Sequence, residues 1–203
     1  MRRAHAGLAA GLLCLVLAAP PLQGMLEASM TAQMLVQIPL LAIAGMLLGK
    51  SLPESAANRI QPWNRGGATG LIMVTFASAC WMLPLSLDAA VVSPAADLAK
   101  FLTVPLLIGL PLASSWPRMS FVLRGVLLFE ALATLFRMGW LYLISPVRLC
   151  NSYGLSDQQR LGEWLLMAGT ALLLCIAWRL LWGSPKAAAG AVGPPGLRAG
   201  RHA

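Results

Sequence analysis

The sequence predicts an all-α membrane protein, a polytopic bundle of about six transmembrane helices with both termini in the cytoplasm. Of the 203 residues, 58% are hydrophobic and only 11% are charged, and the mean hydropathy is +0.73. Soluble domains carry roughly 25% charged residues, so this composition disfavours a soluble domain. The apolar residues also form blocks that approach the ~20 residues needed to cross a hydrocarbon core of ~30 Å. No block alternates strictly between apolar and polar residues as a barrel strand does.

Six apolar blocks define the expected spans. They cover residues 6–22, 30–48, 68–87, 98–114, 121–144 and 164–181. The first block could instead be a cleaved signal peptide, because Arg2 and Arg3 precede an apolar stretch that ends in the small residues Ala18 and Ala19. Retaining it gives an even number of spans and leaves both basic ends of the chain on one side.

Proline and tail composition refine this picture. Pro84, Pro105 and Pro111 fall within the expected spans, where each removes a backbone donor and can bend its helix. Neighbouring helices commonly compensate for such a bend in a membrane.

Residues 184–203 are rich in Ala, Gly and Pro, which predicts a disordered, basic cytoplasmic tail.

The distribution of charged residues predicts the orientation of the bundle. Basic residues concentrate in the segments that lie inside if the N-terminus is cytoplasmic: Arg2, Arg3, Lys50, Arg59, Arg65, Arg118, Arg124, Arg179, Lys186, Arg198 and Arg201. The outer segments contain Lys100, Arg148 and Arg160 together with Glu27, Asp88, Asp97, Asp157 and Glu163. This bias follows the positive-inside rule and indicates a multi-pass protein of a bacterial inner membrane. The net charge of +8 forms no basic patch, so nucleic acid is not an expected partner.

The sequence lacks the residue sets that membrane enzymes need. It contains no nucleotide-binding loop, HExxH motif, Ser-His-Asp set or paired catalytic carboxylates. Its two histidines lie near the chain ends, and its four cysteines show no CxxC spacing: His5, His202, Cys14, Cys80, Cys150 and Cys175. We therefore expect a protein that is not an enzyme.

Three methionines near the outer ends of the second and third spans are candidate metal ligands. Met30 and Met34 are one helical turn apart, as are Gln33 and Gln37, so each pair shares a face. Met82 lies near the end of the following span. Thioether sulfur is a soft ligand that selects Cu(I), which makes these methionines a candidate Cu(I) site. The alternative is ordinary packing, since methionine also fills gaps between helices.

Two ionisable residues lie inside the fifth span. Glu130 and Arg137 are seven residues apart and hence on one face of a helix, with Arg137 directed back toward Glu130. Charges at that depth normally face a partner, a cavity or another subunit. A structural ion pair is favoured over a role in transport, and snorkelling of Arg137 to the headgroups is a further alternative.

The last outer loop contains Asp157-Gln158-Gln159 immediately before the sixth span. Asp157 is a candidate N-cap of that helix, with Ser156 as the alternative. Capping alone does not account for two glutamines after the aspartate.

These stretches together resemble the polytopic CtaG family. That family has a Ser-Pro-Leu-Asp-like turn followed by a His-Met-Leu-x-His helix, and this chain has Pro20-Pro21-Leu22-Gln23 and then Gln33-Met34-Leu35-Val36-Gln37. The family's Trp-His-Leu-Pro and Asp-Ala-Ala are similar to Trp81-Met82-Leu83-Pro84 and Asp88-Ala89-Ala90. Its Asp-Gln-Gln-x-x-Gly loop is matched by Asp157-Gln158-Gln159-Arg160-Leu161-Gly162. The resemblance covers residues 16–167 in order, and its specificity comes from the series of motifs.

The chain departs from the family where the family has histidines. Gln33, Gln37 and Met82 replace histidines, and residues near Asp97 and Phe101 replace later ones. Imidazole is a good copper ligand and a carboxamide is a poor one. Two interpretations stay open: a divergent member that uses methionines for Cu(I), or a paralogue that keeps the scaffold without the metal.

The resemblance implies a non-enzymatic factor that assists the assembly of a haem–copper cytochrome c oxidase or delivers copper to it. The implied partners are the lipid bilayer, an oxidase subunit and a periplasmic copper chaperone. Competing hypotheses are a transporter of small solutes or ions that uses Glu130 and Arg137, and a structural membrane subunit without a ligand.

Overall fold

The described part of the protein consists of helices and the loops that connect them. The computed structural model describes residues 2–64 and 66–182, and these residues form helices with no strands. The expected tail, 184–203, lies outside the described residues. The elements are α1 (Arg2–Leu17), α2 (Pro20–Glu27), α3 (Met30–Ala32), η1 (Gln33–Gln37), α4 (Ile38–Ser51), α5 (Glu54–Ile60), η2 (Gln61–Asn64), α6 (Ala68–Met82), α7 (Pro84–Val92), α8 (Pro94–Thr103), η3 (Val104–Gly109), α9 (Leu110–Ser115), α10 (Phe121–Ile144) and α11 (Leu155–Trp182).

Several helices have the length and apolarity of membrane spans. Among residues 2–64 and 66–182, three helices are long and apolar enough to cross a membrane on their own. They are Met30–Ser51, which joins α3, η1 and α4; Pro94–Ser115, which joins α8, η3 and α9; and Leu155–Trp182. Two bent pairs, α1 with α2 and α6 with α7, raise the number to five if each pair counts as one span. The all-helical class is thus confirmed, and these apolar helices favour a membrane protein. Six spans and a cytoplasmic location of both termini stay predictions.

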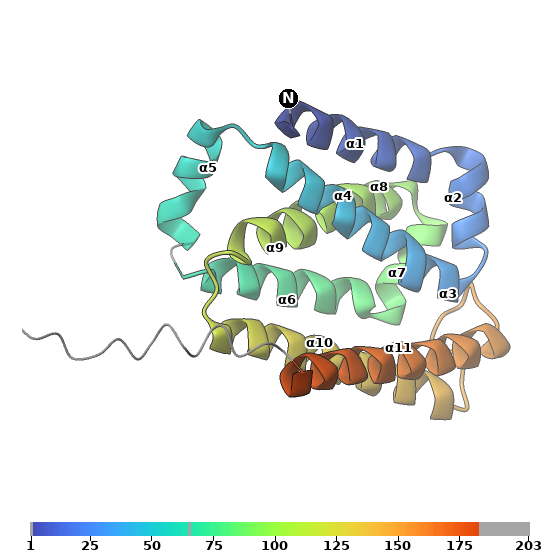
Figure 1. The fold of residues 1–203 in the computed structure, drawn as a ribbon. Helices are drawn as coiled ribbons and strands as arrows, with labels where there is room; N and C mark the ends of the chain where they lie inside the picture. The colour runs from blue at the N-terminus through green and yellow to red at the C-terminus, as the bar shows by residue number, and fades with distance from the viewer. Residues whose placement is uncertain (1, 65, 183–203) are drawn as a thin grey trace, which may run out of the picture.

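Two of the expected spans are broken rather than straight. Helix α1 ends at Leu17 and α2 begins at Pro20, with a bend of 67°, and the α6–α7 pair bends by 68° at Leu83 (Figure 1). Proline causes both breaks. Pro20 and Pro84 occupy first helical positions, and Leu83 takes an extended conformation because the residue before a proline avoids the α region.

The prolines in the helix Pro94–Ser115 do not interrupt it. Pro105 lies inside η3, a π-helical segment of the continuous helix Pro94–Ser115, and Pro111 lies in the first turn of α9. A π-segment widens the helix by one residue, which accommodates a residue that cannot donate a hydrogen bond. The same device precedes Pro39, where η1 spans Gln33–Gln37. This segment carries both glutamines of the second-span motif.

Close helix crossings depend on glycine. A Cβ on Gly45 of α4 would overlap the backbone of Pro105, and one on Gly109 of η3 would overlap the carbonyl oxygen of Ala42. A similar approach joins α10 to α11, where a Cβ on Gly162 would lie 2.8 Å from the carbonyl oxygen of Gly139. Only residues without a side chain allow such approaches. These glycines therefore allow α4 to pack closely against η3, and α10 against α11.

The bundle has two distinct ends. At one end Arg3 pairs with Glu54 at 2.7 Å, and Asn64 donates to Ser115 Oγ at 2.7 Å. At the other end α2, α7 and residues 145–154 lie together (Figure 1). We call this second end the α2 end; it carries the motif residues singled out in the sequence.

Candidate functional site

An ionic cluster of four side chains lies at the α2 end. The Lys100 ammonium of α8 is fully buried and lies 2.6 Å from Glu27 Oε1 and 2.9 Å from Asp97 Oδ1. It also donates to Gln37 Oε1 at 3.0 Å. The cluster thus joins residues that are up to 73 positions apart in the chain.

The two carboxylates stabilise the buried ammonium. An isolated buried charge is very costly, and a paired one is tolerated when hydrogen bonds satisfy its remaining donors. Three oxygens surround the Lys100 ammonium, which has three N–H donors. The contact with Asp97 Oδ1 is an ion pair without hydrogen-bond alignment. With two acids and one base, the formal charge of the cluster is −1.

The placement of Lys100 corrects the sequence-based assignment. The sequence analysis counted Lys100 with the outer segments, as a topology signal, although the residue falls within the expected span 98–114. In the structure it lies inside the helix Pro94–Ser115 and points into the core. The physical reason is that Glu27 and Gln37, from α2 and η1, reach it across the bundle.

Gln37 makes a second hydrogen bond within the cluster, and Gln23 extends it. Gln37 Nε2 donates to Glu27 Oε1 at 3.2 Å, while its oxygen accepts from Lys100. Gln23 Nε2 lies 2.8 Å from Asp97 Oδ2 and 3.3 Å from Glu27 Oε1. An amide can bridge the cation and a carboxylate because it has both a donor and an acceptor. Gln23 and Gln37, both from motif stretches, are therefore committed to this network.

Tyr153, in the loop before α11, contacts both Gln33 and the backbone of Glu27. The Tyr153 hydroxyl contacts both Gln33 Oε1, at 2.9 Å, and the carbonyl oxygen of Glu27, at 2.7 Å. Burial, followed by the Glu27 carboxylate, raises the pKa of Tyr153 above its usual range, so the phenol stays protonated. Gln33 Nε2 is buried and has no partner among the described residues.

Gln158 fixes the shape of the loop 145–154. Its oxygen accepts from the Leu149 amide at 2.9 Å, and its nitrogen lies 3.4 Å from the carbonyl oxygens of Tyr142 and Val147. The side chain is 2% exposed. Gln158 thus provides hydrogen-bond partners for backbone groups of a loop that has no helical hydrogen bonds of its own.

Asp88 and Cys150 fasten the same loop to α7. Asp88 Oδ1 accepts from the Ser152 amide at 2.7 Å, and the Cys150 thiol donates to the carbonyl oxygen of Pro84 at 3.3 Å. Burial, assisted by the Asp88 carboxylate, raises the pKa of Cys150 to about 11. The thiol is therefore a neutral donor at neutral pH.

The remaining residues of the Asp157–Gly162 stretch lie in different environments. The predicted N-cap role of Asp157 is wrong: α11 begins at Leu155, so Asp157 lies within the first turn, where its carboxylate still complements the helix dipole. Ser156 likewise lies inside the helix. Gln159 is exposed, whereas Gly162 provides the close contact with α10.

The candidate copper ligands lie in the apolar core. Met30 and Met34 are 0% and 1% exposed, and the half-buried Met82 packs against the same core. Trp81 donates to Thr103 Oγ1 at 2.9 Å. Residues 2–64 and 66–182 contain no group of three His, Cys, Asp or Glu residues that could hold a metal.

The glutamines of the motif do not fit a copper ion. Gln33 Oε1 is bonded to Tyr153, and Gln37 Oε1 to the Lys100 ammonium. Their oxygens are hard donors already engaged in hydrogen bonds. The methionine sulfurs stay a prediction for Cu(I).

Glu130 and Arg137 lie apart from this site, on the outer surface of α10. Arg137 Nη2 is 2.9 Å from Glu130 Oε1, and Thr134 Oγ1 lies 3.4 Å from both side chains. The arginine side chain is 67% exposed. The pair therefore points away from the bundle interior.

Comparisons with protein-family models, curated proteins and solved structures give no match to this chain. The resemblance to the CtaG family accordingly rests on the sequence motifs alone.

Proposed function

We propose that this chain is a non-enzymatic, multi-pass factor of a bacterial inner membrane that assists assembly of a haem–copper oxidase on a CtaG-like scaffold. One observation carries the proposal. Residues of the separate motif stretches, including Gln33, Gln37, Asp88 and Gln158, meet at the α2 end and organise one surface there. In this proposal the α2 end is the surface that meets the oxidase subunit.

The ionic cluster supports a role that does not depend on a bound metal. Glutamines stand at positions where the family has histidines, and one of them binds the ammonium of Lys100. The Lys100 ammonium is part of the chain, so it can hold Glu27, Gln37 and Asp97 together without an exchangeable metal ion. This favours the interpretation of a paralogue that keeps the scaffold for docking a partner.

The assembly role is tested by deletion and complementation. We expect deletion to lower oxidase activity and the haem and copper content of membranes. Gln158→Ala should fail to restore them, because the loop 145–154 loses its internal anchor. Gln159→Ala, an exposed neighbour, is the matched control and should complement fully.

The level of each variant in the membrane is measured by immunoblot, so that loss of the chain is distinguished from loss of its activity. If oxidase activity and copper content are unchanged on deletion, the assembly role is excluded.

Copper delivery is the second candidate, favoured by the thioethers of Met30, Met34 and Met82 in one apolar core. Purified protein loaded with Cu(I) under reducing conditions should lose copper when these three methionines are replaced by alanine. Met25→Ala is the control, since Met25 lies outside this core and is 73% exposed. A stoichiometry that does not change in the triple variant excludes the metal.

A transport role receives no support from Glu130 and Arg137. Their side chains lie on the outside of α10 and point away from the interior of the described bundle. If Glu130→Gln abolishes the flux of a small solute or ion into proteoliposomes, the transport hypothesis is supported instead.

A further inference from the structure

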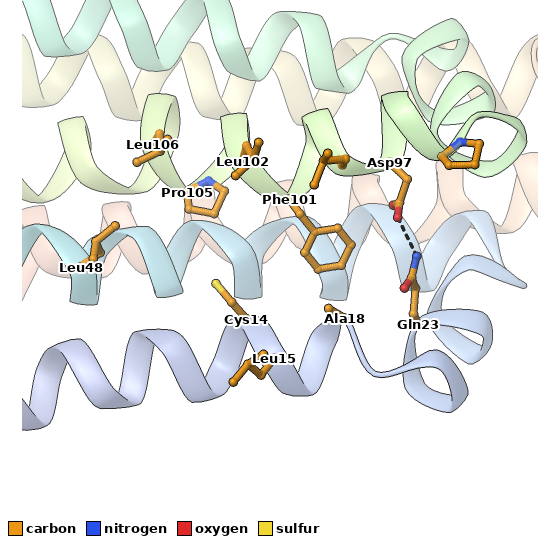
Figure 2. Close-up of a pocket in the computed structure, with 12 residues that line it drawn as sticks. Cys14, Leu15, Ala18, Gln23, Leu48, Asp97, Phe101, Leu102, Pro105 and Leu106 are labelled. Atoms are coloured by element: carbon orange, nitrogen blue, oxygen red, sulfur yellow. Dashed lines mark hydrogen bonds between the residues drawn. The ribbon is translucent and has the colours of Figure 1, made fainter.

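An apolar cleft runs along the surface between α1 and the helix Pro94–Ser115. Its volume is about 470 Å³, within the range of small-molecule sites. In Figure 2, Leu15 of α1 lies on one side, Leu102 and Leu106 on the other, and Leu48 of α4 at one end. Leu98, Leu102 and Leu106 are exposed along it. In a bilayer, this cleft would face the hydrocarbon of the membrane.

One end of the cleft is polar and acidic. Figure 2 shows Asp97 and Gln23 joined there by the 2.8 Å hydrogen bond. The Asp97 side chain is 21% exposed, whereas its partner Lys100 is completely buried behind it. Because Asp97 Oδ1 is buried beside Lys100, a ligand in the cleft meets Asp97 Oδ2, which also accepts from Gln23, and not the ammonium.

The negative charge at this end of the cleft is not neutralised by a basic residue in the cleft lining. Asp97 and Glu27 against Lys100 leave a formal charge of −1, and none of the residues that line the cleft is basic. A cationic group would complement this charge, and an anionic headgroup would be repelled.

The polar end of the cleft and its apolar lining follow one another as the headgroup and acyl chain of a lipid do. Asp97 lies in the first turn of the helix Pro94–Ser115, and the apolar lining continues to Leu106. That distance is about 14 Å along the helix at 1.5 Å per residue. Polar groups at the start of a spanning helix lie at headgroup depth, and the residues that follow lie at the depth of acyl chains.

We propose that the cleft binds a phospholipid whose headgroup carries a primary ammonium, as in phosphatidylethanolamine, with one acyl chain along Leu98, Leu102 and Leu106. The ammonium donates to Asp97 Oδ2, which can accept this hydrogen bond in addition to the one from Gln23. A choline headgroup has no N–H to donate, and a glycerol headgroup has no positive charge. The proposal depends on insertion of the chain in a membrane and not on a role in oxidase assembly.

The test is native mass spectrometry of the full chain in detergent, titrated with phosphatidylethanolamine, phosphatidylcholine or phosphatidylglycerol of identical acyl chains. We expect phosphatidylethanolamine to bind about tenfold more tightly than the others, the effect of one hydrogen bond to a charged group. Equal binding of the three lipids overturns the proposal.

Two variants assign the binding to this cleft. Asp97→Asn should remove the headgroup preference while binding through the acyl chain persists. Ala18→Phe should block all three lipids, because Ala18 lines the cleft and is exposed; Ala9→Phe, at an exposed alanine of α1 outside it, should bind normally. A preference that survives Asp97→Asn, or binding that survives Ala18→Phe, overturns the proposal. Ala18→Phe leaves every charged side chain in place, so it remains informative if Asp97→Asn fails to fold.

Discussion

At the scale of single residues, Lys100 is the buried charge that joins Glu27, Gln37 and Asp97 at the α2 end. Lys100→Met would leave Glu27 and Asp97 partly buried without their cation. Removing one partner of a buried ion pair costs about 3–5 kcal/mol, so we expect a loss of that size in the free energy of unfolding. Reversible unfolding in detergent measures it.

The control for this prediction is Lys50→Met. Lys50 is exposed at the end of α4, and exposed substitutions usually change stability by less than ~0.5 kcal/mol. Adding Glu27→Gln to Lys100→Met should recover part of the loss, because one unpaired carboxylate is then removed. Equal losses for Lys50→Met and Lys100→Met would show that the buried pair contributes nothing.

The sequence predicted which residues share a face, but not their partners. The four-residue spacing of Gln33 and Gln37 placed them together, and both are buried at the α2 end. The roles of Glu27 and Lys100 were missed, because they are 73 positions apart and their pairing depends on how α2 packs on α8. A lysine with an aspartate three residues earlier, at the start of an apolar helix, was the available signal.

At the scale of helices, the sequence marked Pro84, Pro105 and Pro111 as points where a span can bend, and Pro84 does break its helix. Pro20, which follows the break in the first span, was not marked. Pro84 follows an extended Leu83 and breaks the span, whereas Pro105 is absorbed in a π-segment. The difference lies in packing. Around Pro105 the helix is buried against α4 through Gly45 and Gly109, and this contact holds it in one direction.

This crossing gives a second prediction. Gly45→Ala should destabilise the bundle, because its Cβ would overlap the Pro105 backbone and force α4 away from η3. Overpacking of this kind typically costs about 1–3 kcal/mol. The midpoint of thermal unfolding in detergent, followed by circular dichroism, reports the change.

Gly11→Ala is the matched substitution for that experiment. Gly11 also lies in a helix, but nothing lies within 4 Å of an added Cβ. Alanine has the higher helix propensity, so this variant should be unchanged or more stable by up to ~1 kcal/mol. A stable Gly45→Ala variant would contradict the close crossing.

At the scale of the whole molecule, two independent observations agree on the ends of the bundle. The bias of basic residues predicted that Gln33, Met82 and Asp157 belong to one rim. In the structure, Gln33 is hydrogen-bonded to Tyr153 of the loop 145–154. Tyr142 contacts the carbonyl oxygen of Met82 and is also bonded to Gln158, the neighbour of Asp157. The orientation of this end relative to a membrane is a separate question, which charge alone addresses.

The last prediction tests that orientation. In a cysteine-free background, single cysteines are placed at Met25 and Pro146 of the α2 end, and at Glu54 and Pro117 of the opposite end. All four positions are exposed, so differences in labelling will report the side of the membrane rather than burial. If the positive-inside rule sets the topology, an impermeant maleimide should label Met25→Cys and Pro146→Cys in intact cells. It should reach the other two only after permeabilisation. Labelling of Met25→Cys and Glu54→Cys from the same side would mean that the helix Met30–Ser51 does not cross the bilayer.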